Sequence, residues 1–387
     1  MGTISTGRPL SGILCTVFLG LTASGCFDGA YLPNATGSEV EIAVVTDSAS
    51  WHGIIGETLR TELSPWISTL PAPEKMFRLV HTPLTDAESL KRVKKLKNIV
   101  FVAPISDSTL EAQFLRAVLD EEGEAGILGG VSTVVPRRDL WRRNQQVFYV
   151  LGGTEEAVVN IVKKAGDNLR YTFNSIIRER VTTEMFRRGR QFDIEEKLME
   201  KHGFAVNAQH DYFTAIDTTN FVWLRRVINS DSWRSIFIWW IDDASPNSLT
   251  PEWIYEARQR LTESWIAGNS GGFVSIDFRR DLETENIDFL GRFGYETRGL
   301  WHMVGRDDDG KTVEYGMGGP FVTYSFYDEA TRRIYMIDGM VFAPGFDKRE
   351  FLRHVEAIAH TFRLQEVDDS GDSSESTTPP HNSDLGH

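Results

Sequence analysis

The first half of the chain alternates short apolar runs with stretches in which apolar residues recur every three or four positions. The runs are rich in β-branched and aromatic residues and predict four strands, at residues 39–46, 77–82, 98–105 and 145–151. Helical spacing marks residues 51–63 and 109–122. A longer helical region follows over residues 154–201, with a break near Gly189. Strands and helices in alternation predict an α/β layer built on a mostly open sheet.

From residue 203 the pattern changes to strand-like runs with only two helical stretches. Six strands are predicted, at residues 220–228, 234–241, 273–278, 294–304, 320–327 and 333–342. Thr250 and Pro251 mark a helix start, because threonine caps helices and proline suits the first turn. A second helix is expected at Asp347 and Glu350, whose spacing fits a capping box. The pattern predicts an α+β domain, a largely antiparallel sheet with two helices packed on one face.

Both ends of the chain differ in composition from the two halves between them. The stretch 27–38 has no periodicity, and the stretch 367–387 is too rich in Ser, Asp, Thr and Pro to bury a core. The predicted organisation is a signal peptide at 1–25, a tether at 26–38, an α/β domain with a long helical region at 39–202, an α+β domain at 203–365 and a disordered acidic tail at 366–387.

The first residues have the pattern of an export signal that ends in a lipid-modified cysteine. Arg8 gives a positive start, residues 10–21 are apolar, and small residues precede Cys26. The apolar run is too short for a permanent transmembrane helix. A bacterial lipobox usually has Leu where this chain has Ala23, so an ordinary secretory signal or an uncleaved anchor helix stays open. The favoured prediction is cleavage before Cys26 and lipid attachment to its thiol.

Charge and cysteine content narrow the possible partners and cofactors. The chain has 55 acidic against 41 basic residues, a net charge of −14, which argues against nucleic acid as a partner. Cys15 leaves with the signal, so the mature chain keeps Cys26 alone. A lipidated thiol can neither attack a substrate nor bind zinc. We therefore expect no disulfide, no cofactor and no metal site, and we expect the membrane as a partner through the lipid.

Several short sequence motifs are recognisable along the chain. They are Asp47-Ser48 with Trp51, Asn220-Phe221-Val222-Trp223-Leu224-Arg225-Arg226, Arg298-Gly299-Leu300-Trp301, Met317-Gly318-Gly319-Pro320-Phe321-Val322 and Phe342-Ala343-Pro344. Together they resemble the domain of unknown function 4837 family of exported bacterial lipoproteins, over nearly all of residues 39–363. The resemblance implies a fold and an envelope address, because that family has no established activity. The second half also resembles, weakly, PsbP and Mog1-like α/β sandwiches, a likeness of fold alone.

Polar side chains that could take part in catalysis follow the first predicted strand. Asp47 and His52 lie there, and ligands usually bind at the carboxyl ends of strands in open α/β sheets. These residues are too close in sequence to form a Ser-His-Asp triad readily, and no nucleophile-elbow pattern is present. Asp47 or Ser50 as a helix cap is the simpler interpretation. An envelope hydrolase with a site near Asp47 and His52 is kept as the alternative function.

Two further patterns have structural explanations. Gly316, Gly318 and Gly319 precede a strand rather than a helix, which predicts a bulge or tight turn instead of a phosphate loop. Residues 307–310, three aspartates and a glycine, lack the spacing of a calcium loop and fit a turn.

Seven of the ten tryptophans lie in the second half, where they could form an aromatic binding face or fill a core. Trp239 and Trp240 are adjacent and must point to opposite faces of a strand, so one of them lies under another element or is exposed to a ligand. The candidate ligand-binding residues are Asp47, Trp51, His52, Trp223, Arg225, Trp239, Trp240, Arg298 and Trp301. The expected function is ligand or partner binding by a non-enzymatic envelope lipoprotein, with the outer membrane as the expected address and its face left open.

Overall fold

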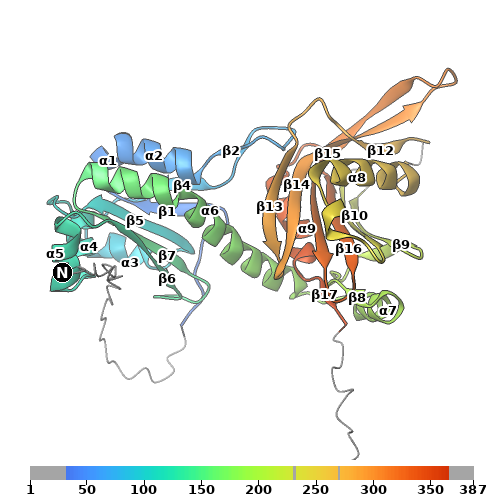
Figure 1. Ribbon diagram of the computed structural model, residues 1–387. Helices are drawn as coiled ribbons and strands as arrows, with labels where there is room; N and C mark the ends of the chain where they lie inside the picture. The colour runs from blue at the N-terminus through green and yellow to red at the C-terminus, as the bar shows by residue number, and fades with distance from the viewer. Residues whose placement is uncertain (1–31, 230–231, 269–270, 366–387) are drawn as a thin grey trace, which may run out of the picture. The chain divides into compact units, whose positions relative to one another are not determined.

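The computed structural model describes residues 32–229, 232–268 and 271–365. The expected signal peptide, Cys26 and the expected acidic tail lie outside these residues. The chain forms two compact units that divide between Val181 and Thr182, within one long helix (Figure 1). This division falls about twenty residues before the expected boundary at residue 203.

The first unit is built on a five-stranded sheet. Its order is β4 (Arg78–His81), β1 (Glu41–Val45), β5 (Asn98–Pro104), β7 (Gln146–Gly152) and β6 (Thr133–Arg138). The first four strands are parallel, whereas β6 pairs antiparallel with β7 at the edge. The four parallel strands are those predicted from the sequence, and β6 was missed. A small separate hairpin joins β2 (Trp66–Ile67) to β3 (Glu74–Lys75).

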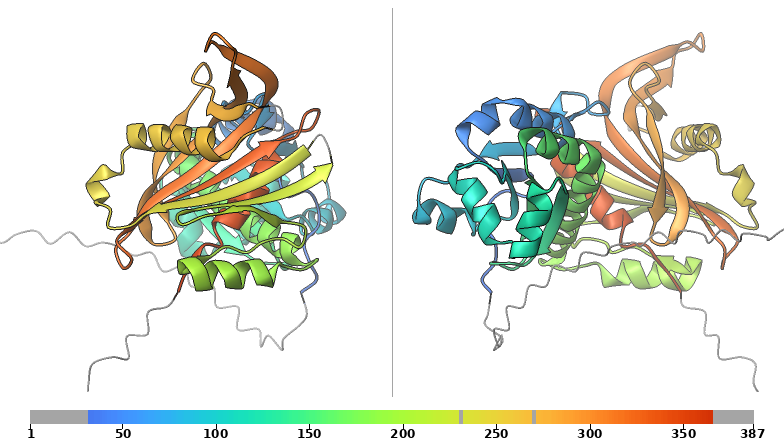
Figure 2. Two further views of the ribbon diagram at one scale, coloured as in Figure 1. Left: turned by 90° about the vertical axis from the view of Figure 1, so that its right-hand side faces the viewer. Right: turned by 60° about the vertical axis from the view of Figure 1, so that its left-hand side comes forward.

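Helices cover both faces of the first sheet, as the turned views show (Figure 2). On one face lie α2 (Ile54–Leu63) and α6 (Glu155–Phe186), and Phe173 of α6 packs on Phe77 and Phe148. On the other face a second apolar cluster surrounds Phe101 and Tyr149. Its helices are α3 (Ala87–Val93), α4 (Leu110–Ala117) and α5 (Glu121–Leu128). The expected α/β layer is therefore a three-layer α/β/α unit.

The stretch expected to be a tether is partly folded onto the first unit. Ala35 is buried and its backbone N–H donates to the Arg143 carbonyl at 2.9 Å. Thr36 forms a bridge with Leu96. The sequence around these residues shows no periodicity because they hold their place through backbone hydrogen bonds, not through an apolar face. A tether reaching residue 38 is thus wrong for residues 34–36.

The second unit begins with the end of α6 and with α7 (Phe192–His202). Gly189, between the two helices, has a positive φ of 118°, which explains the predicted break. The main sheet has the order β12 (Phe273–Ile276), β14 (Arg292–Arg306), β15 (Thr312–Asp328), β16 (Arg333–Phe342), β11 (Ser232–Ile241), β10 (Phe221–Asn229) and β9 (Phe213–Asp217). β13 (Glu283–Phe289) pairs with β14, and all these neighbours are antiparallel. A two-stranded sheet joins β8 (Phe204–Ala205) to β17 (Arg363–Leu364).

Helices α8 (Pro251–Trp265) and α9 (Arg349–Ala359) lie on opposite faces of the main sheet of the second unit, not on one face as expected. Asp338 of β16 binds Arg258 of α8, which follows a short 3-10 turn (Pro246–Ser248). The next residue, Gly339, lies directly against Val355 of α9. Because adjacent strand residues point to opposite faces, α8 and α9 must sandwich the sheet.

Helix starts were predicted with mixed success. Thr250 caps α8 by accepting the Trp253 N–H at 3.3 Å, as expected. The capping box at Asp347 is wrong, because Lys348 occupies the cap position of α9 without a side-chain bond.

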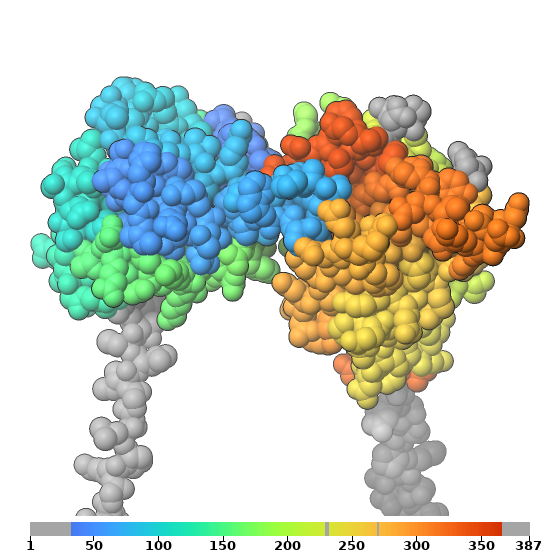
Figure 3. Space-filling model, turned by 90° about the horizontal axis from the view of Figure 1, so that it is seen from above, coloured from blue at the N-terminus to red at the C-terminus, as the bar shows by residue number. Residues whose placement is uncertain are grey.

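The glycine run lies within β15 and produces the predicted irregularity. The pairing of β14 with β15 shifts register between His302 and Val304, opposite the glycines. A methyl group on Gly319 would stand 2.0 Å from the Val341 carbonyl oxygen, so only glycine fits there. Beyond this point the two strands continue as an arm that stands out from the second unit (Figure 3). Asp307 at its tip accepts backbone N–H groups from Asp309 and Lys311, which confirms the predicted turn.

Across residues 32–229, 232–268 and 271–365, no helix combines the length and apolarity needed to span a membrane.

Candidate functional site

The carboxyl ends of the parallel strands form the first candidate site. After β1 the chain enters β4 on one side, whereas β5 lies on the other side of β1. Open α/β sheets bind ligands outside the carboxyl ends of the strands at such a reversal. A ligand-binding site is therefore expected among the residues that follow β1, β4 and β5.

Asp47 directly follows β1 and caps the short helix α1 (Ser48–His52). Its Oδ1 accepts the backbone N–H groups of Ala49 at 2.9 Å and Ser50 at 3.1 Å. Burial by itself would raise the pKa of Asp47, but hydrogen bonds from Ser50 and Ala49 outweigh burial and hold the pKa below its ordinary value. Asp47 is thus a structural carboxylate, as the simpler interpretation predicted.

Trp51 and His81 form a stacked pair beside this cap. Their rings are nearly parallel, with centroids 5.0 Å apart, and His81 is the last residue of β4. The Arg60 guanidinium lies over the Trp51 ring at 5.0 Å and donates to the Trp51 carbonyl at 3.1 Å. The half-buried indole is therefore fixed by two neighbours from different elements.

His52 completes the cluster through contacts with the backbone. Its Nδ1 lies 2.8 Å from the Ser48 carbonyl oxygen, and its ring meets His81 edge-on with centroids 6.3 Å apart. The His81 Nε2 lies 3.0 Å from the Thr46 carbonyl oxygen. No hydrogen bond or ion pair joins His52 to Asp47. The catalytic pair of the hydrolase hypothesis is therefore not assembled.

Glu111 and Thr46 also lie at this edge, but the sequence did not identify them as candidate site residues. Glu111, in the first turn of α4, is only 2% exposed and accepts the Leu84 N–H at 2.7 Å. It therefore reaches from the helix after β5 to the loop after β4. Thr46 is fully buried, and its hydroxyl has no hydrogen-bond partner in the structure. A glutamate in a helical first turn is usually solvated, so no local pattern signals this burial.

The tryptophan pair of β11 does not form an exposed aromatic face. Trp239 and Trp240 point to opposite faces, as predicted, but they are only 9% and 2% exposed. Trp239 stacks on Trp253 of α8. Trp240 packs edge-on against His202 and Phe204 on the other side. Both rings are core residues because both faces of the sheet are covered.

Trp301 is also a core residue, stacked on Trp233 with centroids 5.3 Å apart. Trp223 is buried, and the Arg225 guanidinium lies over its ring at 4.8 Å. Of Trp301, Trp223 and Arg225, only Arg225 is partly exposed.

Arg298 lies on the α9 face between two carboxylates. It pairs with Glu296, and its Nη1 lies 2.7 Å from Oε1 of Glu356. Burial by itself would lower the pKa of Arg298, but these two carboxylates raise it well above its usual value. Arg298 therefore joins α9 to the sheet and is not available to a ligand.

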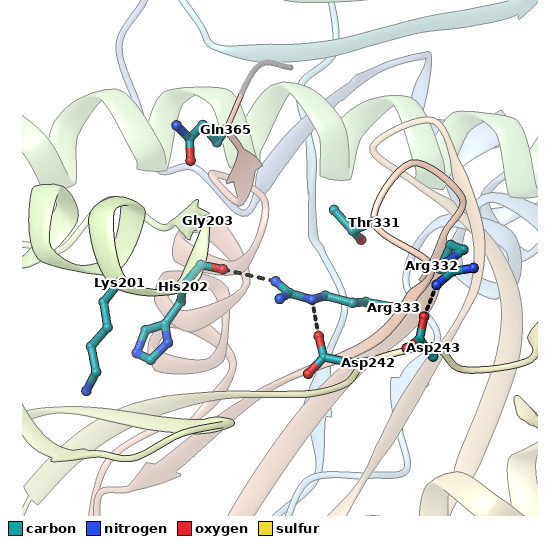
Figure 4. A pocket seen from close by; sticks show the side chains of 9 residues that line it. All are labelled: Lys201, His202, Gly203, Asp242, Asp243, Thr331, Arg332, Arg333 and Gln365. Carbon is teal, nitrogen blue, oxygen red and sulfur yellow. Dashed lines mark hydrogen bonds and ion pairs between the residues drawn. The ribbon is translucent and has the colours of Figure 1, made fainter. Parts of the chain in front are cut away.

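A hollow of about 700 Å³ opens in the second unit between α7 and the ends of β11 and β16. Figure 4 shows its charged side chains in pairs: Arg333 with Asp242 at 2.6 Å and Arg332 with Asp243. Lys201 lies 2.7 Å from Asp217. Because these cations already have carboxylate partners, the hollow offers little to an anionic ligand. It is a solvated groove of ion pairs. Within the described part of the chain, no cluster of three His, Cys, Asp or Glu could hold a metal ion.

These features define a two-domain protein, an α/β/α unit with a polar strand edge followed by an antiparallel sheet between two helices. Residues 191–361 match the Domain of unknown function (DUF4837), and this part of the chain belongs to that family. Residues 35–186 match a different one, the Domain of unknown function (DUF8532). The resemblance seen in the sequence is thus confirmed for the second half, while the first half, with Asp47 and Trp51, has its own family. The gap at 187–190 lies close to the structural division.

Comparison with known proteins yields distant likenesses of fold. The Saccharomyces cerevisiae Ran-binding protein Mog1p is 9% identical, with a TM-score of 0.29, over 42% of this chain and 91% of that one. A mutant of protein Mog1 is 10% identical, with a TM-score of 0.27, over 42% of this chain and 92% of that one. A structure from Bacteroides thetaiotaomicron is 11% identical, with a TM-score of 0.21, over 42% of this chain and 46% of that one. No curated protein matches the sequence.

Proposed function

We propose that this chain is a lipid-anchored protein of the bacterial cell envelope that binds a ligand at the carboxyl edge of its first sheet and does not transform it. The observation that carries the binding site is the pair His52 and His81. A carbonyl oxygen can only accept a hydrogen bond, so His52 Nδ1 and His81 Nε2 must be the donors to Ser48 and Thr46. In the neutral form the second nitrogen of each ring is then an acceptor.

The chemistry of this edge selects for ligands that donate hydrogen bonds. Its side chains supply the second imidazole nitrogens of His52 and His81 as acceptors, whereas Arg60 is stacked on Trp51. We therefore infer a small ligand rich in hydroxyl or amine groups. A hydrolase finds less support, because Asp47 is engaged as a helix cap and is not joined to His52.

Saturation-transfer NMR on the mature protein tests this site. The probes are N-acetylglucosamine, glucosamine and a fully O-methylated glucoside that has no hydroxyl donor. We expect signal from the first two and none from the third. His52→Ala with His81→Ala should weaken binding at least about tenfold, whereas the exposed His210→Ala should not. Silence from both donor sugars, or equal binding by the double variant, would refute the proposal.

The membrane anchor is tested separately. If Cys26 carries the lipid, Cys26→Ser should leave the protein in the aqueous phase of a detergent partition or unprocessed in the envelope, while wild type enters the detergent phase. Unchanged partitioning of the variant would contradict lipidation at Cys26.

A further inference from the structure

Arg225 occupies an unusual position on the α8 face of the second sheet. Its guanidinium lies 4.8 Å from the ring centroid of Trp223 and 5.8 Å from that of Trp233. It makes no hydrogen bond or ion pair with any residue that the structure describes, and its Nε is shielded from solvent. The side chain is half-buried, so part of the guanidinium reaches the surface.

The surroundings of Arg225 contain more hydrogen-bond donors without an acceptor. The indole nitrogens of Trp223 and Trp301 and the hydroxyl of Ser235 are buried and unpaired. Ser235 lies opposite Arg225 in the strand register, and Trp233 stacks on Trp301. This end of the sheet face therefore has several donors that none of the described residues satisfies. Buried donors without partners are rare in folded proteins and call for an explanation.

Arg225 also lacks a counter-charge, which favours an anionic ligand. The chain has a net charge of −14, yet among residues 32–229, 232–268 and 271–365 no carboxylate forms an ion pair with this guanidinium. The next residue, Arg226, has its counter-charge in Asp211 at 2.6 Å. Burial without such a partner lowers the pKa of Arg225. Contact with two indole rings offsets only part of the cost of removing a cation from water.

We propose that Arg225, framed by Trp223 and Trp233, binds the carboxylate or phosphate oxygens of a small ligand that also carries an apolar group. A guanidinium binds such oxygens through two parallel hydrogen bonds, and here the rings already hold it in one place. The apolar group is inferred from Val227, which lies on the same face of β10 and is 48% exposed. This site lies in the second unit and is independent of the site proposed at His52 and His81.

Titration of the mature protein with three anions tests the proposal and separates the sources of the oxyanion. Octanoate offers a carboxylate with an apolar chain, acetate the carboxylate alone, and inorganic phosphate a free ion. Calorimetry gives the affinity, and spectra of isotope-labelled indole N–H groups report on Trp223. We expect octanoate to bind at least about tenfold more tightly than acetate. Tighter binding of free phosphate than of octanoate would overturn the apolar part of the proposal.

Variants decide whether Arg225 is responsible. Arg225→Gln should abolish octanoate binding, and Arg225→Lys should weaken it, because an ammonium keeps the charge but loses the two parallel donors. The matched control is Arg332→Gln, an exposed arginine paired with Asp243. Equal binding by wild type and both Arg225 variants, or no binding of any anion to wild type, would overturn the site. If Arg225→Gln does not fold, octanoate binding by Arg225→Lys and the octanoate-induced shift of the Trp223 indole N–H signal in wild type decide the question.

Discussion

A buried ion pair joins the main sheet of the second unit to α8. Arg258 of α8 and Asp338 of β16 have fully buried side chains, and Nε of the arginine lies 2.7 Å from Oδ2 of the aspartate. Thr323 donates to the same oxygen at 2.5 Å. The guanidinium also lies 3.6 Å from the ring centroid of Phe321. Removal of either charge would leave the other one buried without its partner.

Arg258→Ala should therefore lower the free energy of unfolding by about 3 to 5 kcal/mol. Urea denaturation measures the change. Arg332→Ala breaks an exposed pair and should cost less than about 1 kcal/mol. Replacing both partners, as Arg258→Met with Asp338→Leu, should recover much of the loss, because no charge then stays buried. Similar small losses for the two single variants would contradict this role for the buried pair.

His354 should make the second unit sensitive to acid. Burial, with the neighbouring cations Arg234 and Arg226, lowers its pKa from 6.5 to about 3. Its Nδ1 accepts a hydrogen bond from Arg234, which the protonated ring could not do. Between these two pKa values the unfolded chain binds a proton that the folded chain does not. Stability is therefore complete above about pH 6.5 and falls towards pH 3, by up to about 1.4 kcal/mol per pH unit.

The measurement is the free energy of unfolding between pH 6.5 and 4 for wild type and His354→Asn. Asparagine can still accept from Arg234 but does not titrate in this range. We expect the free energy of unfolding of the variant to depend less steeply on pH, with a slope that corresponds to up to one bound proton fewer. Parallel curves for the two proteins would exclude His354 as the titrating group.

At the scale of elements, the strands of the second unit carry large side chains on both faces. β11 sends Trp239 towards α8 and Trp240 towards Phe204, and the first nine of its ten residues are buried. Such a strand has no exposed face, because helices or smaller elements cover each side. The same arrangement explains why Gly339 faces Val355 while Asp338 faces Arg258.

Trp239→Ala and Trp240→Ala should consequently both destabilise the protein, each by about 3 to 5 kcal/mol. Thermal or urea melts of the two variants measure this. Trp66 is 61% exposed in the β2–β3 hairpin, so Trp66→Ala is the control and should have little effect. A silent change at either Trp239 or Trp240 would show that the ring is not part of a core.

On the scale of the whole molecule, two units with separate cores share one long helix. The division between Val181 and Thr182 and the family boundaries at 186 and 191 nearly coincide. Beyond the helix, α7 belongs to the second unit, where Glu195 pairs with Arg190 and Arg363. The exposed residues between α6 and α7 are therefore the natural point of cleavage.

Limited trypsin digestion should cut first at Arg187 or Arg188, which are exposed at the end of α6. Each product should keep its own cooperative unfolding transition, since each has its own core. Mass spectrometry locates the cut, and calorimetry of the separated fragments measures the transitions. A lack of any transition in one fragment would mean that this unit depends on the other.

Local patterns in the sequence determined most of the elements. Alternating apolar residues identified the buried strands, Thr250 and Asp47 were recognisable as caps, and the glycine run indicated a bulge. The missed strands β6, β9 and β13 are edge or outlying strands with many exposed side chains, so they have little apolar alternation to detect. The side of the sheet on which a helix packs is likewise invisible to a local pattern.

Only the tertiary structure decided which candidate residues are available to a ligand. The sequence placed Asp47, His52, Trp239 and Arg225 among the candidates with equal weight. The fold engages Asp47 in a cap, buries Trp239 under α8, and leaves His52 and Arg225 with unused hydrogen-bonding capacity. The physical reason is that burial and pairing depend on residues far apart in the chain, such as Trp233 with Trp301 or Glu111 with Leu84, whose proximity arises only when the sheets assemble.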